Sequence, residues 1–218
     1  MSGIIIKNLC FEIGDFSLNN FSLEVKKGTY FVLTGANGSG KTTLIKLIAG
    51  IYSPLSGGIT INNVDVKKIP PWKRNIGYLP QEGLLFPNRT VKENIQFPLE
   101  VRKIPKSEVI KEINAVAEML EISELLNRKP EGLSGGEKQK VCLARAIISK
   151  PDVLLLDEPV SAIDEKSKYA YCQKLKSLQR RLKITTLHIS HNKTETELVA
   201  DEVGIMPERK GVETQLSS

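Results

Sequence analysis

The sequence has no long apolar run and no cysteine pattern of the kind found in membrane-spanning or disulfide-bonded proteins. Nothing in its 218 residues approaches the ~18 consecutive apolar residues that a membrane span needs, and the N-terminus has no basic start followed by an apolar run. If the protein works at a membrane, we therefore expect it to do so through a partner. The three cysteines, Cys10, Cys142 and Cys172, form no CxxC pair, which argues against a disulfide framework or a zinc site and favours a reducing cytoplasm.

The sequence also lacks a concentrated run of basic residues, although its formal net charge is +6. Its lysines and arginines are scattered along the chain, so the charge alone does not indicate a dedicated nucleic-acid surface. No internal repeat or low-complexity linker divides the chain. A hydrophobic content of 40% is enough for a core, and we expect one domain over residues 1–218.

The distribution of apolar residues predicts an α/β fold. Residues 3–25 alternate around Gly14-Asp15 and predict an antiparallel β-hairpin. Apolar strands separated by helices predict a mostly parallel sheet covered on both faces. The strands are expected at residues 29–35, 57–62, 75–80, 152–158 and 183–190.

The middle of the chain changes to a helical pattern over residues 91–128. One predicted amphipathic helix has Ser107 as its candidate N-cap. Its apolar positions fall on one face: Val109, Ile113, Val116, Ala117 and Leu120. We expect a helical subdomain, at about residues 88–150, inserted between two strands of the main sheet.

A glycine-rich segment at residues 35–42, GANGSGKT, fits the pattern G-x-x-x-x-G-K-[ST] between a predicted strand and a predicted helix that ends at Gly50. In such a loop the backbone N–H groups and the helix N-terminus hold phosphates, Lys41 reaches the β- and γ-phosphates, and Thr42 offers a hydroxyl to Mg²⁺. The alternative is a glycine-rich turn without a ligand. The predicted nucleotide contacts are Gly35, Ala36, Asn37, Gly38, Ser39, Gly40, Lys41, Thr42 and Thr43.

Two acids end the strand DVLLLDE, at the edge of an open α/β sheet where ligands bind. Asp157 can hold the magnesium shell, and Glu158 can polarise the water that attacks the γ-phosphate. By themselves, two acids after a strand more often belong to a solvated loop. The phosphate loop earlier in the chain favours the functional interpretation.

A second glycine-rich segment, LSGGE at residues 133–137, has the S-x-x-E spacing of a capping box. Ser134 and Glu137 therefore predict the start of a helix. A capping box does not account for Gly135 and Gly136, because glycine lowers helix propensity and is useful chiefly where something approaches the backbone closely.

Six motifs occur in the order GANGSGKTT, YLPQEG, LSGGE, DVLLLDEP, SAID and HISH. In this order they resemble the nucleotide-binding subunit of an ATP-binding cassette (ABC) transporter, from the first hairpin to about Met206. The resemblance implies a P-loop NTPase core with a mostly parallel sheet, an N-terminal antiparallel β subdomain and an inserted α-helical subdomain. It also implies that two cassettes pair head to tail.

The resemblance assigns roles to single residues. Gln81 would touch Mg²⁺ and the attacking water, and His191 would hydrogen-bond the γ-phosphate; outside this context Gln81 is an ordinary turn residue. Asp164 in SAID would link the two sites, where the alternative is a helix cap. The implied groups are Lys41, Gln81, Glu158 and His191 for catalysis, Thr42, Gln81 and Asp157 for the metal, and Ser134, Gly135, Gly136 and Glu137 for ATP held by the other subunit.

The chain departs from the family pattern in places. Ile13 stands where an aromatic residue commonly stacks on adenine, and Phe16 or Phe11 would have to replace it. Asn192 replaces the usual acid after His191. The sequence ends soon after this motif, so the extra C-terminal β-domain of several importer ATPases is not expected. His188, in the middle of its strand, is interpreted as a core residue.

The resemblance implies a Mg²⁺-dependent ATP hydrolase that energises transport at the cytoplasmic face of the membrane. Its expected partners are a second cassette, identical or not, integral membrane permease subunits and an external substrate-binding protein. We expect import, and the stretch IPPWKRNIGYLPQEGLLFP is similar to oxyanion (molybdate, tungstate, sulfate) importers. An exporter remains the alternative. A soluble ABC ATPase acting on nucleic acid or the ribosome would usually carry a coiled coil, a zinc insertion or a second cassette, so no nucleic-acid partner is expected.

The apolar residues 84–87, LLFP, directly follow the Gln81 motif in a predicted loop. Exposed apolar residues often mark an interface, and in the family this region receives a cytoplasmic helix of the membrane subunit. The alternative is that these residues pack under the helical subdomain.

Overall fold

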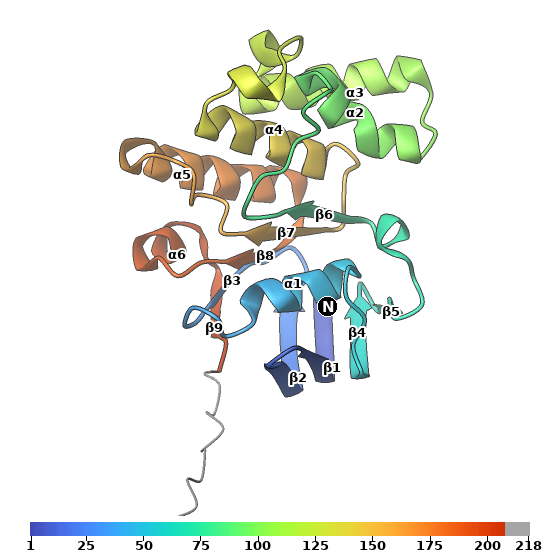
Figure 1. Ribbon diagram of the computed structural model, residues 1–218, viewed down its shortest axis with the longest axis vertical. Helices are drawn as coiled ribbons and strands as arrows, with labels where there is room; N and C mark the ends of the chain where they lie inside the picture. The colour runs from blue at the N-terminus through green and yellow to red at the C-terminus, as the bar shows by residue number, and fades with distance from the viewer. Residues whose placement is uncertain (208–218) are drawn as a thin grey trace, which may run out of the picture.

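The computed structural model describes residues 1–207, which form two β-sheets and the helices that cover them (Figure 1). One sheet is antiparallel and has the strand order β2-β1-β4-β5. Its strands are β1 (Ser2–Ile13), β2 (Phe16–Lys26), β4 (Ser56–Ile61) and β5 (Val64–Asp65). The other sheet is parallel and has the order β6-β7-β8-β3-β9. Its strands are β6 (Ile76–Leu79), β7 (Val153–Asp157), β8 (Thr185–Ile189), β3 (Tyr30–Thr34) and β9 (Glu202–Ile205).

The first two strands form the hairpin predicted from the sequence. Ile13 pairs with Phe16 across the two-residue turn Gly14-Asp15, and Gly14 has a φ of 53°. A glycine adopts such a left-handed conformation without the steric cost of a Cβ, which suits it to a tight hairpin turn. The hairpin places Phe16 at the start of β2, where its ring lies against Gly40 of the glycine-rich loop.

The parallel sheet brings four sequence motifs to one edge. Gly35 directly follows β3, Gln81 follows β6 by two residues, Glu158 directly follows β7, and His191 follows β8 by two residues. Because all these strands run in the same direction, their carboxyl ends meet at the same edge of the sheet, where open α/β sheets bind ligands. The topology alone therefore gathers residues that are up to 156 positions apart, from Gly35 to His191.

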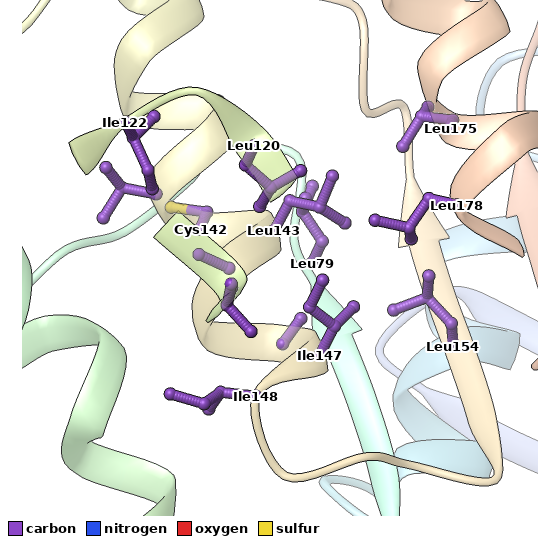
Figure 2. Close-up of a cluster of buried hydrophobic side chains, with 14 of the residues drawn as sticks. Leu79, Leu120, Ile122, Cys142, Leu143, Ile147, Ile148, Leu154, Leu175 and Leu178 are labelled. Atoms are coloured by element: carbon purple, nitrogen blue, oxygen red, sulfur yellow. The ribbon is translucent and has the colours of Figure 1, made fainter. Parts of the chain in front are cut away.

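The parallel sheet is covered on both faces, as its continuous apolar strands predict. Phe31, Leu33 and Leu155 face α1 and the antiparallel sheet, whereas Val32 and Leu154 face the other helices. Figure 2 shows part of this second core, in which side chains from β6, β7, α3, α4 and α5 meet. The helices are α1 (Lys41–Ala49), α2 (Val91–Val101), α3 (Lys106–Leu120), α4 (Gly135–Ile147), α5 (Glu165–Leu182) and α6 (Lys193–Val199).

Helices α2, α3 and α4 lie between β6 and β7 in the sequence and gather at one end of the molecule (Figure 1). The predicted apolar face of α3 is buried in their common core. The N-cap expected for α3 was wrong. The helix begins at Lys106 after Pro105, so Ser107 lies inside the first turn and no side chain caps this end. Proline fixes its own φ near −57° here, which lets the helix start directly behind it.

Three regular elements have no counterpart in the sequence prediction. They are the two-residue strand β5, the short helix α6 and the edge strand β9. Each is short, and periodicity over so few residues does not distinguish one structure from another. Their places are fixed by contacts with other elements, since β5 pairs with β4, β9 pairs with β3, and α6 packs against α5.

Candidate active site

The loop after β3 wraps tightly at the N-terminus of α1. Gly35, Gly38 and Gly40 have φ values of 148°, 77° and 100°. A side chain on Gly40 would also collide with the Phe16 ring, because an added Cβ would lie 2.2 Å from its Cζ atom. Glycine at position 40 therefore lets the aromatic ring lie directly against the loop.

Lys41 is folded across this loop. Its Nζ donates hydrogen bonds to the carbonyl oxygens of Gly35 and Ala36, both at 2.8 Å. Burial lowers the pKa of Lys41, and the carboxylates of Glu158 and Asp157 oppose this shift. The first turn of α1 contains no acidic residue, so its N–H groups and the positive end of the helix dipole meet no competing carboxylate there. The loop thus has the charge and the donors of a phosphate cradle.

Asp157 ends β7 and is almost fully buried, at 1% exposed. Its Oδ1 accepts a hydrogen bond of 3.0 Å from the Thr42 hydroxyl at the start of α1. Burial raises the pKa of Asp157, and the hydrogen bond from Thr42 opposes the rise. A hydroxyl and a carboxylate are therefore held side by side, which is the oxygen donor set that Mg²⁺ prefers.

Glu158 is held between two side chains from neighbouring strands. Gln81 Nε2 donates a hydrogen bond of 3.2 Å to Glu158 Oε2, and His191 Nδ1 lies 3.1 Å from Oε1. The backbone of Glu158 has a φ of 48°, which is unusual for a residue other than glycine. Its N–H donates to the carbonyl of Ile189 at the end of β8, and this hydrogen bond ties the strained turn to the sheet.

Most of these groups open into one cavity of about 510 Å³, which Gly35 and Asp157 adjoin in sequence but do not line. It is lined by Phe16, Asn37, Gly38, Gly40, Lys41, Thr42, Thr43, Gln81, Glu158 and His191. The structure also separates the two candidate aromatics. Phe11 is buried at 6% exposed and stacks on Tyr52 with 5.4 Å between ring centroids, whereas Phe16 lies at the cavity.

The LSGGE segment lies in a different cavity, of about 660 Å³, that shares no lining residue with the first. The predicted capping box is present, because Ser134 Oγ accepts from the N–H of Glu137 at 3.3 Å and Glu137 Oε2 accepts from the N–H of Ser134 at 2.7 Å. Asp164 lines the same cavity and caps α5 through the N–H of Ser167 at 3.1 Å.

The two glycines of LSGGE differ in their surroundings. A Cβ on Gly135 would lie 2.9 Å from the carbonyl oxygen of Ala162, so the chain itself requires a glycine at this position. A Cβ on Gly136 would meet no atom within 4 Å. Nothing within residues 1–207 therefore explains Gly136, which costs helix propensity inside the first turn of α4.

Comparison with known proteins identifies the family. The ABC transporter family model matches residues 18–161. The chain belongs to this family. The match includes the motifs from GANGSGKTT to DVLLLDEP, and the P-loop NTPase fold that the resemblance implied is confirmed.

Curated ABC relatives match almost the whole chain. It is 46% identical over 200 residues to the molybdate/tungstate import ATP-binding protein WtpC of Methanocaldococcus jannaschii, covering 92% of this chain and 66% of the relative. It is 42% identical over 201 residues to WtpC of Pyrococcus horikoshii, covering 92% and 58%. It is 40% identical over 225 residues to the trehalose/maltose import ATP-binding protein MalK of Thermococcus litoralis, covering 100% and 60%. The chain thus spans about three fifths of the length of these relatives.

Solved ABC cassettes have the same fold. The dimeric structure of MJ0796, a bacterial ABC transporter cassette, superposes with a TM-score of 0.82 at 28% identity, covering 93% of this chain and 94% of that one. A second structure of MJ0796, in a post-hydrolysis state bound to ADP and Pi, gives the same TM-score at 27% identity. Both solved cassettes are described as dimers.

The cavity of this ABC chain fits a nucleotide and a magnesium ion. Ser39 is buried and does not line this cavity, whereas Gly38 does, and a Cβ on Gly38 would meet no atom of residues 1–207 within 4 Å, which leaves open space against the loop backbone. Thr42 and Asp157 provide adjoining oxygen donors, and Gln81 adds an amide at the same cavity. The arrangement can hold a phosphate chain at one end and a polarised water beside Glu158 at the other.

Sequence patterns missed one polar group close to this site. His188 is fully buried in β8, as its interpretation as a core residue requires, but it is not surrounded by apolar groups alone. Its ring lies between Tyr30 and Glu195, a buried acid of α6. The only signal in the sequence was the acid itself, four residues after His191.

Proposed function

We propose that this chain is an ATP-binding and ATP-hydrolysing subunit that energises import across a membrane as part of an ABC transporter. The observation that carries the proposal is the convergence of Lys41, Gln81, Glu158 and His191 on one cavity at the carboxyl edge of the parallel sheet. Residues 1–218 would act as one nucleotide-binding domain, with a helical subdomain at about residues 88–150.

Each group at the cavity has a role that its chemistry suits. Lys41 and the N–H groups of residues 35–43 bind the phosphates, and Phe16 offers its ring face to the adenine. Thr42, Asp157 and Gln81 would hold Mg²⁺, which neutralises charge on the phosphate oxygens. Glu158 accepts a hydrogen bond from the attacking water, while Gln81 and His191 hold its carboxylate in place. The His191 side chain contacts Glu158 through Nδ1 and is 59% exposed, so its other ring nitrogen is the one that would hydrogen-bond the γ-phosphate.

The separation of the two cavities supports a site shared between two subunits. Ser134, Gly135, Gly136, Glu137 and Asp164 do not line the cavity that contains Lys41. A second cassette, identical or not, would bring them over the nucleotide by pairing head to tail. ATP would then favour the closed pair through its higher affinity for that form, and hydrolysis would reverse the preference.

A groove of about 420 Å³ beside β6 is suited to a permease subunit. Trp72 and Leu84 at this groove are 64% and 65% exposed, and Phe86 lines it as well. Leu85 instead packs against the helical core, as the alternative interpretation expects, whereas Leu84 and Phe86 line the groove that we propose for the permease. Arg145 donates a hydrogen bond to the carbonyl of Leu84 and lies over the Phe86 ring, which makes its role structural.

The direction and substrate of transport are inferred from the relatives. Those matched carry names for the import of molybdate/tungstate, trehalose/maltose, iron(III) and spermidine/putrescine, all at 39–46% identity. We favour an oxyanion such as molybdate or tungstate, with permease subunits and an external substrate-binding protein as partners and no nucleic acid. Within residues 1–207, no helix has the length and apolar character needed to cross a membrane. The import function in the names of the relatives leads us to place the chain at the cytoplasmic face of the membrane, bound through the permease.

The experiment that tests this function uses Glu158→Gln. Glutamine retains the shape of the side chain and its contacts with Gln81 and His191, but it cannot accept a proton. We expect ATP affinity close to that of the wild type, turnover lower by ~10²- to 10⁴-fold, and an ATP-bound dimer on a sizing column. Glu197→Gln is the matched control, because Glu197 is exposed on α6. Wild-type turnover in Glu158→Gln would contradict the proposal.

A further inference from the structure

We propose that Glu195 and His188 are positioning residues for His191, acting through a buried chain of side chains that fixes the loop between β8 and α6. The inference rests on the proposed function, since that function gives His191 its role beside Glu158. Neither residue faces the nucleotide cavity.

Glu195 is the centre of this chain. It is 6% exposed, and its Oε2 accepts a hydrogen bond of 2.6 Å from Ser190 Oγ. Its Oε1 lies 2.9 Å from Nε2 of His188, which is fully buried. The other ring nitrogen of His188, Nδ1, lies 2.9 Å from the Tyr30 hydroxyl in β3. The side chains therefore connect α6 through β8 to the neighbouring strand.

The same atoms hold the residues on both sides of His191. Ser190 Oγ accepts a hydrogen bond of 3.0 Å from the N–H of Asn192. Asn192 Oδ1 in turn accepts from the N–H of Glu195 at 3.1 Å, as the N-cap of α6. Because Ser190 and Asn192 are linked to each other and to Glu195, the backbone of His191 has little freedom to turn away from Glu158.

Packing cannot replace these hydrogen bonds. A cavity of about 170 Å³ adjoins the loop and is lined by Glu158, Lys168, Ser190, His191 and Glu195, among others. A volume of this size is large enough for several waters at ~30 Å³ each, so the loop lacks a close-packed side chain on this side. Its position depends on directed polar contacts instead.

The charge of Glu195 strengthens these contacts. Burial acts to raise the pKa of Glu195, but the hydrogen bonds and charge of His188 together with Ser190 outweigh it and leave the pKa lowered. The carboxylate is thus ionised, and hydrogen bonds to an ionised acceptor are about twice as strong as neutral ones. Removing it would also take away the carboxylate that lies 2.9 Å from the buried Nε2 of His188.

The alternative is that this group only stabilises the start of α6. An NMR experiment can distinguish a positioning role from a purely structural one, because the chain contains only two histidines, His188 and His191. The ¹H–¹⁵N imidazole spectrum of the nucleotide-free protein therefore reports the two rings without interference. Glu195→Ala is the breaking variant. Glu195→Gln is the conservative one, since its amide can donate to Ser190 and accept from His188.

Two further variants complete the design. Glu197→Ala is the matched control, because this glutamate is on the same helix, 66% exposed, and 3.9 Å from Lys193 at the surface. Ser190→Ala removes the link to Asn192 with little change in volume. If Glu195→Ala does not fold, this variant still tests whether the buried polar contacts position His191. Glu158→Gln provides the reference spectrum for an altered partner of His191.

We expect the His191 resonances of Glu195→Ala and Ser190→Ala to shift and broaden relative to the wild type, with kcat reduced ~10- to 100-fold and the KM for ATP little changed. Glu195→Gln should restore most of the wild-type His191 spectrum and most of kcat, and Glu197→Ala should match the wild type in both. An unaltered His191 spectrum with only a lower Tm would overturn the proposal. If the wild type does not hydrolyse ATP, the proposed function fails, and the imidazole spectra still decide whether Glu195 positions His191.

Discussion

Alanine substitutions at the two glycines of LSGGE should have different effects. Gly135→Ala should lower the stability of the fold, whereas Gly136→Ala should keep the stability and abolish ATP hydrolysis. At Gly135, alanine would place a Cβ 2.9 Å from the backbone carbonyl oxygen of Ala162, which is closer than such contacts allow. The loop carrying Ala162 or the start of α4 must then move, and overpacking of this kind costs ~1–3 kcal/mol. For a chain of 218 residues, the Tm should fall by ~2–4 °C per kcal/mol.

At Gly136 the same substitution meets no atom of the chain. Alanine is better than glycine in a helix by up to ~1 kcal/mol, so Gly136→Ala should keep or raise the Tm by as much as ~2–4 °C. Gly136→Gln should also fold, because its longer side chain extends into the 660 Å³ cavity. Both variants should nevertheless lose ATP hydrolysis, since a side chain would stand where the nucleotide of the partner cassette approaches the backbone.

Differential scanning calorimetry and a steady-state ATPase assay on the same preparations test this reasoning. Nucleotide binding to the isolated chain should be unchanged in both Gly136 variants, because the loop at residues 35–43 lies in the other cavity. Wild-type hydrolysis in Gly136→Gln, or a Gly135→Ala variant as stable as the wild type, would refute the account of this segment.

Two further predictions concern the aromatic residues and the acid of α6. Phe16→Ala should weaken ATP binding by ~5- to 10-fold, the equivalent of a lost stacking contact, and because Phe16 is only partly buried against the core, it should lower the Tm less than Phe11→Ala does. Phe11→Ala should instead destabilise the fold by ~3–5 kcal/mol and leave the ATP affinity of the folded fraction intact, because Phe11 is buried against Tyr52. Calorimetric titration measures both affinities, and equal ATP affinities in the two variants would mean that Phe16 does not stack on adenine. Because the pKa of Glu195 is lowered in the folded chain, its contribution to stability is present above the unfolded value of ~4.3 and is lost as the pH falls through the folded pKa. Urea unfolding at a series of acidic pH values should therefore show a flatter pH dependence for Glu195→Gln, and identical slopes would mean that Glu195 has the same pKa folded and unfolded.

The sequence predicted those parts of the site that short-range chemistry determines. The capping box of Ser134 and Glu137, the hairpin turn at Gly14 and the glycine-rich loop before Lys41 each depend on residues a few positions apart. Propensity and spacing are sufficient for such features, because the interacting groups belong to the same turn or helix end.

Other features depend on contacts between distant segments and could not be predicted. Phe11 and Phe16 both lie in the first hairpin, and their roles are separated by the packing of Phe11 on Tyr52 and by the position of Phe16 at the cavity. The need for Gly135 follows from the position of Ala162 in the loop after β7. The wrong N-cap at Ser107 has a local cause, because the rigid backbone of Pro105 started the helix earlier than side-chain capping would have done.

If one chain holds only half of the site, the two halves should meet only between two chains, and cross-linking can detect this meeting. Asn37→Cys marks the nucleotide loop, and Gly132→Cys marks the exposed residue before LSGGE, where a side chain meets no atom within 4 Å. Both are made in chains that also carry Glu158→Gln and Cys10→Ser, and a short bismaleimide is added. We expect a cross-linked heterodimer that forms only when the Asn37→Cys chain and the Gly132→Cys chain are mixed and ATP is present. A cross-link within a single chain that carries both cysteines, or a mixture that gives no ATP-dependent product, would contradict it.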